Sequence, residues 1–141
     1  MIMIKAQCHC GQVQIELTHK PDYINDCNCS LCSAAGAIWG YYEGAAVRIT
    51  GDRSTYVRAD YPLAAVAIHS CTRCGTTTDW TITEKYQAEK GPMDRCGVNM
   101  RLFDPGLLEG VEVRFPDGRA WTGEEDYGYR RDPIIMGRDA Y

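Results

Sequence analysis

The stretch Cys27-Asn28-Cys29-Ser30-Leu31-Cys32 places three thiols within six residues. Two cysteine pairs flank it, Cys8-His9-Cys10-Gly11 near the start and Cys71-Thr72-Arg73-Cys74-Gly75 in the middle of the chain. Clusters this tight are typical of thiolates that bind zinc. Two pairs complete one tetrahedral site, whereas the three remaining thiols leave one position for water or substrate. The spacing therefore predicts one closed zinc site and one open zinc site.

The composition is typical of a soluble globular protein. The 141 residues are expected to form a single domain, 1-141, whose polar and aromatic tail, about residues 117–141, packs loosely at the periphery or is partly mobile. The net charge of −4 gives no general attraction to phosphate backbones, so nucleic acid is not expected as a partner. Because no signal sequence and no membrane-length apolar run is present, we expect no membrane association and a cytoplasmic location. Cysteines in that reducing compartment favour metal binding, although their even number leaves disulfides as an alternative.

Short alternating segments predict a mainly β fold with the cysteine pairs in its turns. Residues 12–18 alternate strictly, with Val13, Ile15 and Leu17 on one face, which is typical of a half-buried strand. Residues 2–8 would pair with this strand through the turn that carries the first two cysteines. Further strands are predicted at residues 46–50, 54–58, 63–69, 76–83, 98–103 and 111–115, with a tight loop at the triple-cysteine segment and a loop or short helix at 84–96.

The two cysteine pairs are placed to reach one ion. Cys8 and Cys10 are two residues apart in a strand-to-turn segment, so both side chains can point to the same side. In the second turn Gly75 lets the backbone curl so that N–H groups approach the sulfurs. An ion held by Cys8, Cys10, Cys71 and Cys74 would tie the two hairpins together, and its loss should unfold the protein.

The fourth position of the second site has candidate ligands within the chain. Cys96, the eighth cysteine, would close a second structural site, or it is simply a small buried side chain. The other candidates are His9, His19 and His69, although isolated histidines more often only donate hydrogen bonds. If the position stays open, three thiolates leave a zinc centre with a charge of about −1, which suits an incoming thiol better than water. The expected ligand is then a sulfur compound.

The ordered cysteine motifs, with Gly36 soon after the second and Val98-Asn99-Met100-Arg101 after the third, resemble the glutathione-dependent formaldehyde-activating enzyme family, also called the CENP-V/GFA domain. The match runs from about Cys8 to Asp104. The resemblance implies a β-tent fold of short antiparallel strands with zinc-bearing turns. It also implies a carbon–sulfur lyase activity in which glutathione and formaldehyde combine reversibly to S-hydroxymethylglutathione. It implies two zinc ions per chain: a structural one held by Cys8, Cys10, Cys71 and Cys74, and a second one held by the catalytic residues Cys27, Cys29 and Cys32, where the glutathione sulfur binds.

The residues around the substrate are less well specified by the sequence. Glutathione carries carboxylates, and its cationic partners are sought among Arg73, Arg101 and Arg130, although exposed arginines are more often merely solvated. Aromatic residues just past the cysteine loop would wall the pocket or, more commonly in small β domains, belong to the core. These are Trp39, Tyr41 and Tyr42.

Two other functions remain open at this level. One is a non-catalytic zinc-stabilised module that binds a protein partner. The other is a thiol redox protein, because three neighbouring cysteines without metal can oxidise to a disulfide. The sequence leaves the identity of the small aldehyde and the oligomeric state undetermined.

Overall fold

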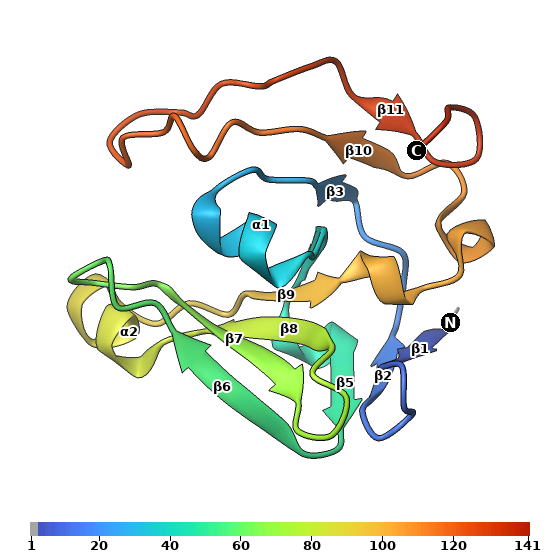
Figure 1. Ribbon diagram of the computed structural model, residues 1–141, viewed down its shortest axis with the longest axis horizontal. Coiled ribbons are helices and arrows are strands. Elements are labelled where there is room, and N and C mark those ends of the chain that lie inside the picture. Colours follow the sequence, from blue (N-terminus) through green and yellow to red (C-terminus); the bar gives the residue numbers. More distant parts are fainter. Residues whose placement is uncertain (1–2) are drawn as a thin grey trace.

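A computed structural model describes residues 3–141 and arranges them in two β-sheets with short helices around them (Figure 1). The smaller sheet is antiparallel throughout. Its strands, in spatial order, are β1 (Ile4–Gln7), β2 (Gln14–Leu17) and β5 (Val47–Thr50). The side chains of Val13, Ile15 and Leu17 are fully buried, as their alternation predicts.

The larger sheet has eight strands in the order β11-β10-β3-β4-β9-β8-β7-β6. They are β3 (Tyr23–Asn25), β4 (Trp39–Tyr42), β6 (Arg53–Val57), β7 (Val66–Cys71), β8 (Thr77–Ile82), β9 (Cys96–Asn99), β10 (Glu112–Arg114) and β11 (Ile134–Ile135). The mainly β architecture predicted from the sequence is confirmed. The expected antiparallel pairing is seen in both sheets, with the exception of β10 and β3, which pair in parallel. Such a pair forms where a long connection brings the chain back beside an early strand.

Two segments differ from the sequence prediction. The triple-cysteine segment, expected as a tight loop, runs into helix α1 (Ser30–Ala35), whose first turn is capped by Cys29 Sγ accepting from the Cys32 backbone N–H. The predicted strand at 98–103 is instead β9 followed by a 3₁₀ turn at Met100–Leu102. Here the Asn99 side chain accepts a hydrogen bond from the Arg101 N–H and turns the chain.

The remaining helices are short. The segment 84–96 contains α2 (Glu84–Lys90), capped by the Thr83 side chain, which confirms the short-helix alternative. Further 3₁₀ turns lie at Gly44–Ala46 and Pro105–Leu108. No helix within residues 3–141 is long and apolar enough to cross a membrane.

Helix α1 packs against the larger sheet. A small apolar cluster formed by Ala37, Trp39, Ile68 and Trp80 packs against Leu31, Cys32 and Ala35 of the helix. Gly97 makes room for this cluster, because a Cβ atom there would lie 2.0 Å from Trp80 Nε1. This apolar cluster therefore positions helix α1, which carries Cys32.

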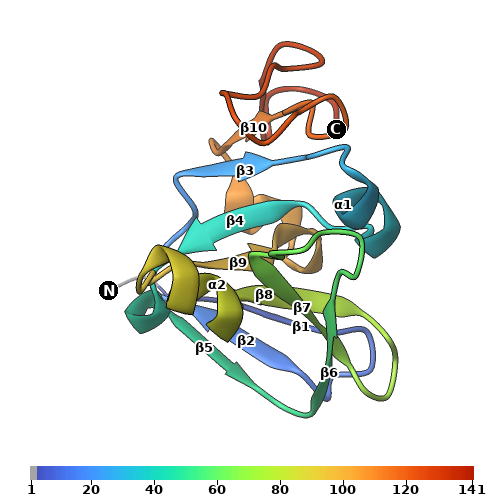
Figure 2. The ribbon, with the colours of Figure 1, turned by 90° about the vertical axis from the view of Figure 1, so that its left-hand side faces the viewer.

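The chain beyond β10 runs out and back as an extended C-terminal arm, residues 116–130. The Asp117 N–H donates to Gly128 O at 2.7 Å, and the Arg130 N–H donates to Phe115 O at 2.9 Å. In Figure 1 the arm, coloured orange to red, passes above the loop between β3 and α1, and Figure 2 shows it again on that side of the molecule. The arm thus lies next to the triple-cysteine segment.

Candidate metal centres

Four thiols from the two hairpin turns converge on one point. The Sγ atoms of Cys8, Cys10, Cys71 and Cys74 all lie within 4.8 Å of one another, and we call them the four-cysteine cluster. The Sγ atoms of Cys8 and Cys10 are 3.6 Å apart, and those of Cys10 and Cys71 are 3.7 Å apart. Disulfide-bonded sulfurs lie about 2 Å apart, so these are free thiols at the spacing of ligands around a shared ion.

Backbone and hydroxyl groups point at these sulfurs. The Val13 N–H donates to Cys8 Sγ at 3.2 Å, and the Arg73 N–H donates to Cys71 Sγ at 3.4 Å. Gly75 has a φ of 76°, so the backbone curls at this glycine as predicted. Hydrogen bonding to Thr76 lowers the pKa of Cys74 to about 5. Donors aimed at sulfur stabilise the thiolate form, so the four-cysteine cluster fits a thiolate-bound metal ion.

Three more thiols converge between β3 and α1. The Sγ atoms of Cys27, Cys29 and Cys32 lie within 4.8 Å of one another, and each residue is partly exposed. We call them the three-cysteine cluster. The Cys29 N–H donates to Cys27 Sγ at 3.4 Å, and the Cys32 N–H donates to Cys29 Sγ at 3.3 Å. The turn entering α1 therefore orients all three side chains to one side.

The three-cysteine cluster on its own stabilises one negative charge. Hydrogen bonds from the Cys27 and Cys32 thiols lower the pKa of Cys29. Hydrogen bonding to Cys29 in turn raises the pKa of Cys27, and hydrogen bonding to Cys27 and Cys29 raises the pKa of Cys32. A divalent cation would remove this competition, because thiols that coordinate a metal lose their protons. The donor set fits a soft divalent ion such as zinc.

No fourth side chain completes the three-cysteine cluster among the described residues 3–141. Cys96 lies on β9 instead, with its Sγ 3.6 Å from Tyr42 O. His69 is hydrogen-bonded to the hydroxyls of Thr55 and Thr81, and His19 to the Lys20 carbonyl. His9 has its backbone N–H near the hydroxyl of Thr76, beside the other cluster. The candidates for closing the site from within the chain thus lie elsewhere.

The C-terminal arm packs directly on the three-cysteine cluster, a contact that sequence reasoning missed. A Cβ atom on Gly118 would lie 2.4 Å from Cys27 Sγ and 3.1 Å from Cys29 Cβ. The side chain of Asn28, between these two cysteines, donates to Asp117 Oδ1 at 2.9 Å and accepts from the Arg119 N–H at 3.0 Å. The partners are about ninety residues apart in sequence, so no local pattern could have indicated the contact.

A polar pair, Asn25 and Tyr41, joins β3 to β4 beside the triple-cysteine segment, and Asn25 stands two residues before Cys27. Asn25 is 5% exposed, and its Nδ2 donates to the Tyr41 hydroxyl at 2.9 Å. Its Oδ1 has no hydrogen-bond partner within the part of the chain that the structure describes. Burial raises the pKa of Tyr41, so its hydroxyl stays protonated at neutral pH. Buried polar atoms without partners are uncommon, so Asn25 Oδ1 is a notable unpaired acceptor among the described residues.

The arginines expected to bind glutathione carboxylates are placed differently from one another. Arg73 belongs to the turn of the four-cysteine cluster. Arg101 and Arg130 both face Asp26, at 3.9 Å and 3.5 Å, so their charges are partly neutralised. Arg58 donates to Ser30 Oγ at 3.3 Å but is also paired with Asp60 at 2.7 Å.

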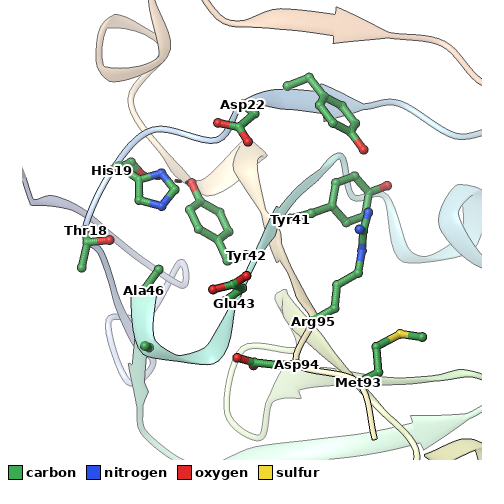
Figure 3. A pocket seen from close by; sticks show the side chains of 12 residues that line it. Thr18, His19, Asp22, Tyr41, Tyr42, Glu43, Ala46, Met93, Asp94 and Arg95 are labelled. Atoms are coloured by element: carbon green, nitrogen blue, oxygen red, sulfur yellow. Dashed lines mark hydrogen bonds between the residues drawn. The ribbon is translucent and has the colours of Figure 1, made fainter. Parts of the chain in front are cut away.

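Of the aromatic candidates, Trp39 and Tyr42 are buried core residues and Tyr41 is half-buried. Trp39 is buried in the apolar cluster under α1. Tyr41 and Tyr42 line a hollow of about 750 Å³, shown in Figure 3, together with Arg95, which stacks on the Tyr41 ring at 4.5 Å. None of the described residues that line this hollow is a cysteine, and three are carboxylates, Asp22, Glu43 and Asp94. Its charge therefore disfavours an anionic thiol.

Comparisons with known proteins agree with this arrangement. The crystal structure of a Rhodobacter sphaeroides protein matches with a TM-score of 0.56 and 24% identity, covering 77% of this chain and 97% of that one, which supports the fold alone. Comparison with curated proteins gave no match. A family model described as glutathione-dependent formaldehyde-activating enzyme matches residues 3–103, a range that contains both cysteine clusters and ends before the arm. The chain therefore belongs to the glutathione-dependent formaldehyde-activating enzyme family.

Proposed function

We propose that the protein is a zinc-dependent enzyme of the carbon–sulfur lyase type that binds glutathione or a related thiol at the three-cysteine cluster. There it would form or break an S-hydroxymethyl-type adduct with formaldehyde or another small aldehyde. The observation that carries the proposal is the convergence of three thiols without a fourth protein ligand in the described residues 3–141, in a chain of this family.

The two clusters would have different roles. Cys8, Cys10, Cys71 and Cys74 would hold a structural zinc ion that joins the β1–β2 turn to the β7–β8 turn. Cys27, Cys29 and Cys32 would hold the second ion. When bound there, zinc would lower the pKa of an incoming thiol and keep it as a nucleophilic thiolate. Backbone N–H groups of the turn donate to two of the three sulfurs, those of Cys27 and Cys29, and would hold them in place for this purpose.

The reaction itself requires little from the protein beyond positioning. The substrate sulfur attacks the carbonyl carbon, a C–S bond forms, and the C=O π pair moves to the oxygen. The oxygen gains one proton and the thiol loses one, so the addition is balanced through solvent. Holding the two reactants together converts a bimolecular encounter into an effectively unimolecular step. The arm beside the cluster would limit how the thiol approaches.

The proposal is tested by metal content and by one matched pair of variants. Protein purified without chelator should contain about two zinc ions per chain, counted by elemental analysis. Cys29→Ser should keep the fold but abolish any acceleration of thiol–aldehyde adduct formation, followed by NMR exchange between free thiol and adduct. Cys96→Ser is the control, because Cys96 lies outside both clusters and should leave the rate unchanged. An unaltered rate in Cys29→Ser would remove the proposed site.

A thiol redox protein is the second candidate, because the three-cysteine cluster consists of free thiols within 4.8 Å of one another. A stoichiometry of one zinc ion, with a reversible disulfide between two of these thiols, would favour it. Two zinc ions without a change at the second site on addition of glutathione would favour a zinc-stabilised binding module. Free thiols, whether they bind metal or act in redox chemistry, fit a reducing compartment such as the cytoplasm.

A further inference from the structure

The arm is fastened to the three-cysteine cluster through one residue, Asn28. Its side-chain amide donates to Asp117 Oδ1 at 2.9 Å and accepts from the Arg119 N–H at 3.0 Å. Its backbone carbonyl accepts from Arg119 Nε at 3.2 Å. Because Asn28 stands between Cys27 and Cys29, these three hydrogen bonds fix the arm beside two of the three thiols.

The same contacts hold a guanidinium group against the backbone of Asn28, the residue between Cys27 and Cys29. Arg119 uses its Nε on the Asn28 carbonyl, which leaves its two terminal amino groups for another partner. No carboxylate lies within ion-pair distance of Arg119 among the residues from Met3 onward. Arg58, the other arginine near this loop, is already held by Asp60. The cation beside the thiols that has no counter-charge is therefore Arg119.

Charge explains why a cation is useful at this position. A zinc ion with three thiolates carries a charge of about −1, so an anionic thiol approaching it is repelled. A guanidinium beside the cluster offsets this repulsion, and its planar pair of terminal amino groups matches the two oxygens of a carboxylate. Arg119 is exposed, so a substrate carboxylate can reach it without displacing protein groups.

We propose that Arg119 binds a carboxylate of the incoming thiol, so that the substrates of this site are carboxylate-bearing thiols. The inference rests on the proposed function of the three-cysteine cluster. Arg119 lies beyond the residues that match the family model, so this recognition is a property of the arm of this chain. Glutathione satisfies the requirement, as does any small thiol with a carboxylate a few bonds from the sulfur.

The test compares two thiols of equal length, 3-mercaptopropionate and 3-mercapto-1-propanol, with glutathione as the larger substrate. Protein loaded with cobalt(II) in place of zinc reports thiol binding through its sulfur-to-metal absorption bands, so dissociation constants are measured without catalysis. Wild type, Arg119→Ala and Arg119→Lys are compared. Arg131→Ala is the control. Arg131 directly follows the arm, is exposed, and stacks on Phe115 at 4.4 Å.

Arg119→Ala should weaken binding of 3-mercaptopropionate and glutathione by roughly 10- to 100-fold, the range for a hydrogen-bonded charge pair. Binding of the neutral 3-mercapto-1-propanol should change less than about twofold. Arg119→Lys should restore part of the loss, and Arg131→Ala should behave like wild type. Equal losses for both small thiols would show that Arg119 has only a structural role. This result would overturn the inference about Arg119 but leave the proposed function standing. Spectra that no thiol changes would overturn the proposed function as well.

Discussion

Replacing Gly118 by alanine tests whether the arm depends on close contact with the three-cysteine cluster. The added Cβ would lie 2.4 Å from Cys27 Sγ, whereas ordinary contacts between such atoms lie near 3.5–4 Å. The arm or the cysteine must therefore move by more than about 1 Å. Gly118 does not have a positive φ, so alanine adds no backbone strain and the effect isolates the contact.

The size of the effect of Gly118→Ala depends on whether the arm or Cys27 moves. Overpacking of a tight contact costs about 1–3 kcal/mol. Three hydrogen bonds to Asn28 hold the arm, each contributing about 1 kcal/mol, whereas Cys27 lies in a loop anchored by β3 and α1. We therefore expect the arm to detach rather than the cysteine to shift. A cost of 1–3 kcal/mol corresponds to a roughly 5- to 150-fold increase in the detached population.

Limited proteolysis measures that population. Trp121 and Tyr129, exposed in the arm, are cleavage sites for a protease that cuts after aromatic residues, and cleavage tracks the open fraction when reclosing is fast. Gly128→Ala is the matched control, because a Cβ there meets no atom within 4 Å and its φ is also not positive. If Gly118→Ala were cleaved no faster than Gly128→Ala, close packing of the arm on the thiols would be refuted.

The other predictions concern the metal clusters and the polar pair beside them. Cys71→Ser should give insoluble or metal-poor protein with a lowered melting temperature, because it removes a buried thiol from the four-cysteine cluster in which the two hairpin turns meet; soluble protein with an unchanged melting curve and zinc content would contradict this. Tyr41→Phe should lower the free energy of unfolding by about 1–3 kcal/mol in urea, because Asn25 Nδ2 would lose its partner in a buried place. Tyr42→Phe, which removes a hydroxyl on the opposite face of the same strand, serves as the comparison. If Tyr41→Phe had the same free energy of unfolding as wild type, water would be satisfying the Asn25 amide.

Much of the fold follows from local patterns in the sequence. The strict alternation around Ile15 gave a strand close to its observed position, because one face of that strand is buried. The run at 76–83 gave another, because it is rich in β-branched residues. Strands β3 and β4 show neither pattern and were missed. They lie inside the larger sheet, and Trp39-Gly40-Tyr41-Tyr42 is buried or half-buried on both faces, so it shows no alternation. Strand β11 has only two residues and depends on its partner β10.

The division of the cysteines was predictable because ligand spacing is local, but the surroundings of the clusters were not. Cys71 and Cys74 can be assigned to one turn from their spacing alone. The contact of Gly118 with Cys27 joins residues far apart in sequence and depends on the return of the chain along β10. No composition or periodicity marks that glycine, and the same holds for Arg119.

The topology explains why one cysteine cluster has four thiols and the other has three. The four-cysteine cluster takes two thiols from each of two hairpin turns, which face one another and can surround an ion. The three-cysteine cluster comes from one short segment, which presents its thiols from a single side. The second segment that reaches it, the arm, brings Gly118, a residue without a ligating side chain. The number of thiols in the three-cysteine cluster therefore follows from which chain segments meet there, and Cys96, which lies on β9 with its Sγ near Tyr42 O, does not add to it.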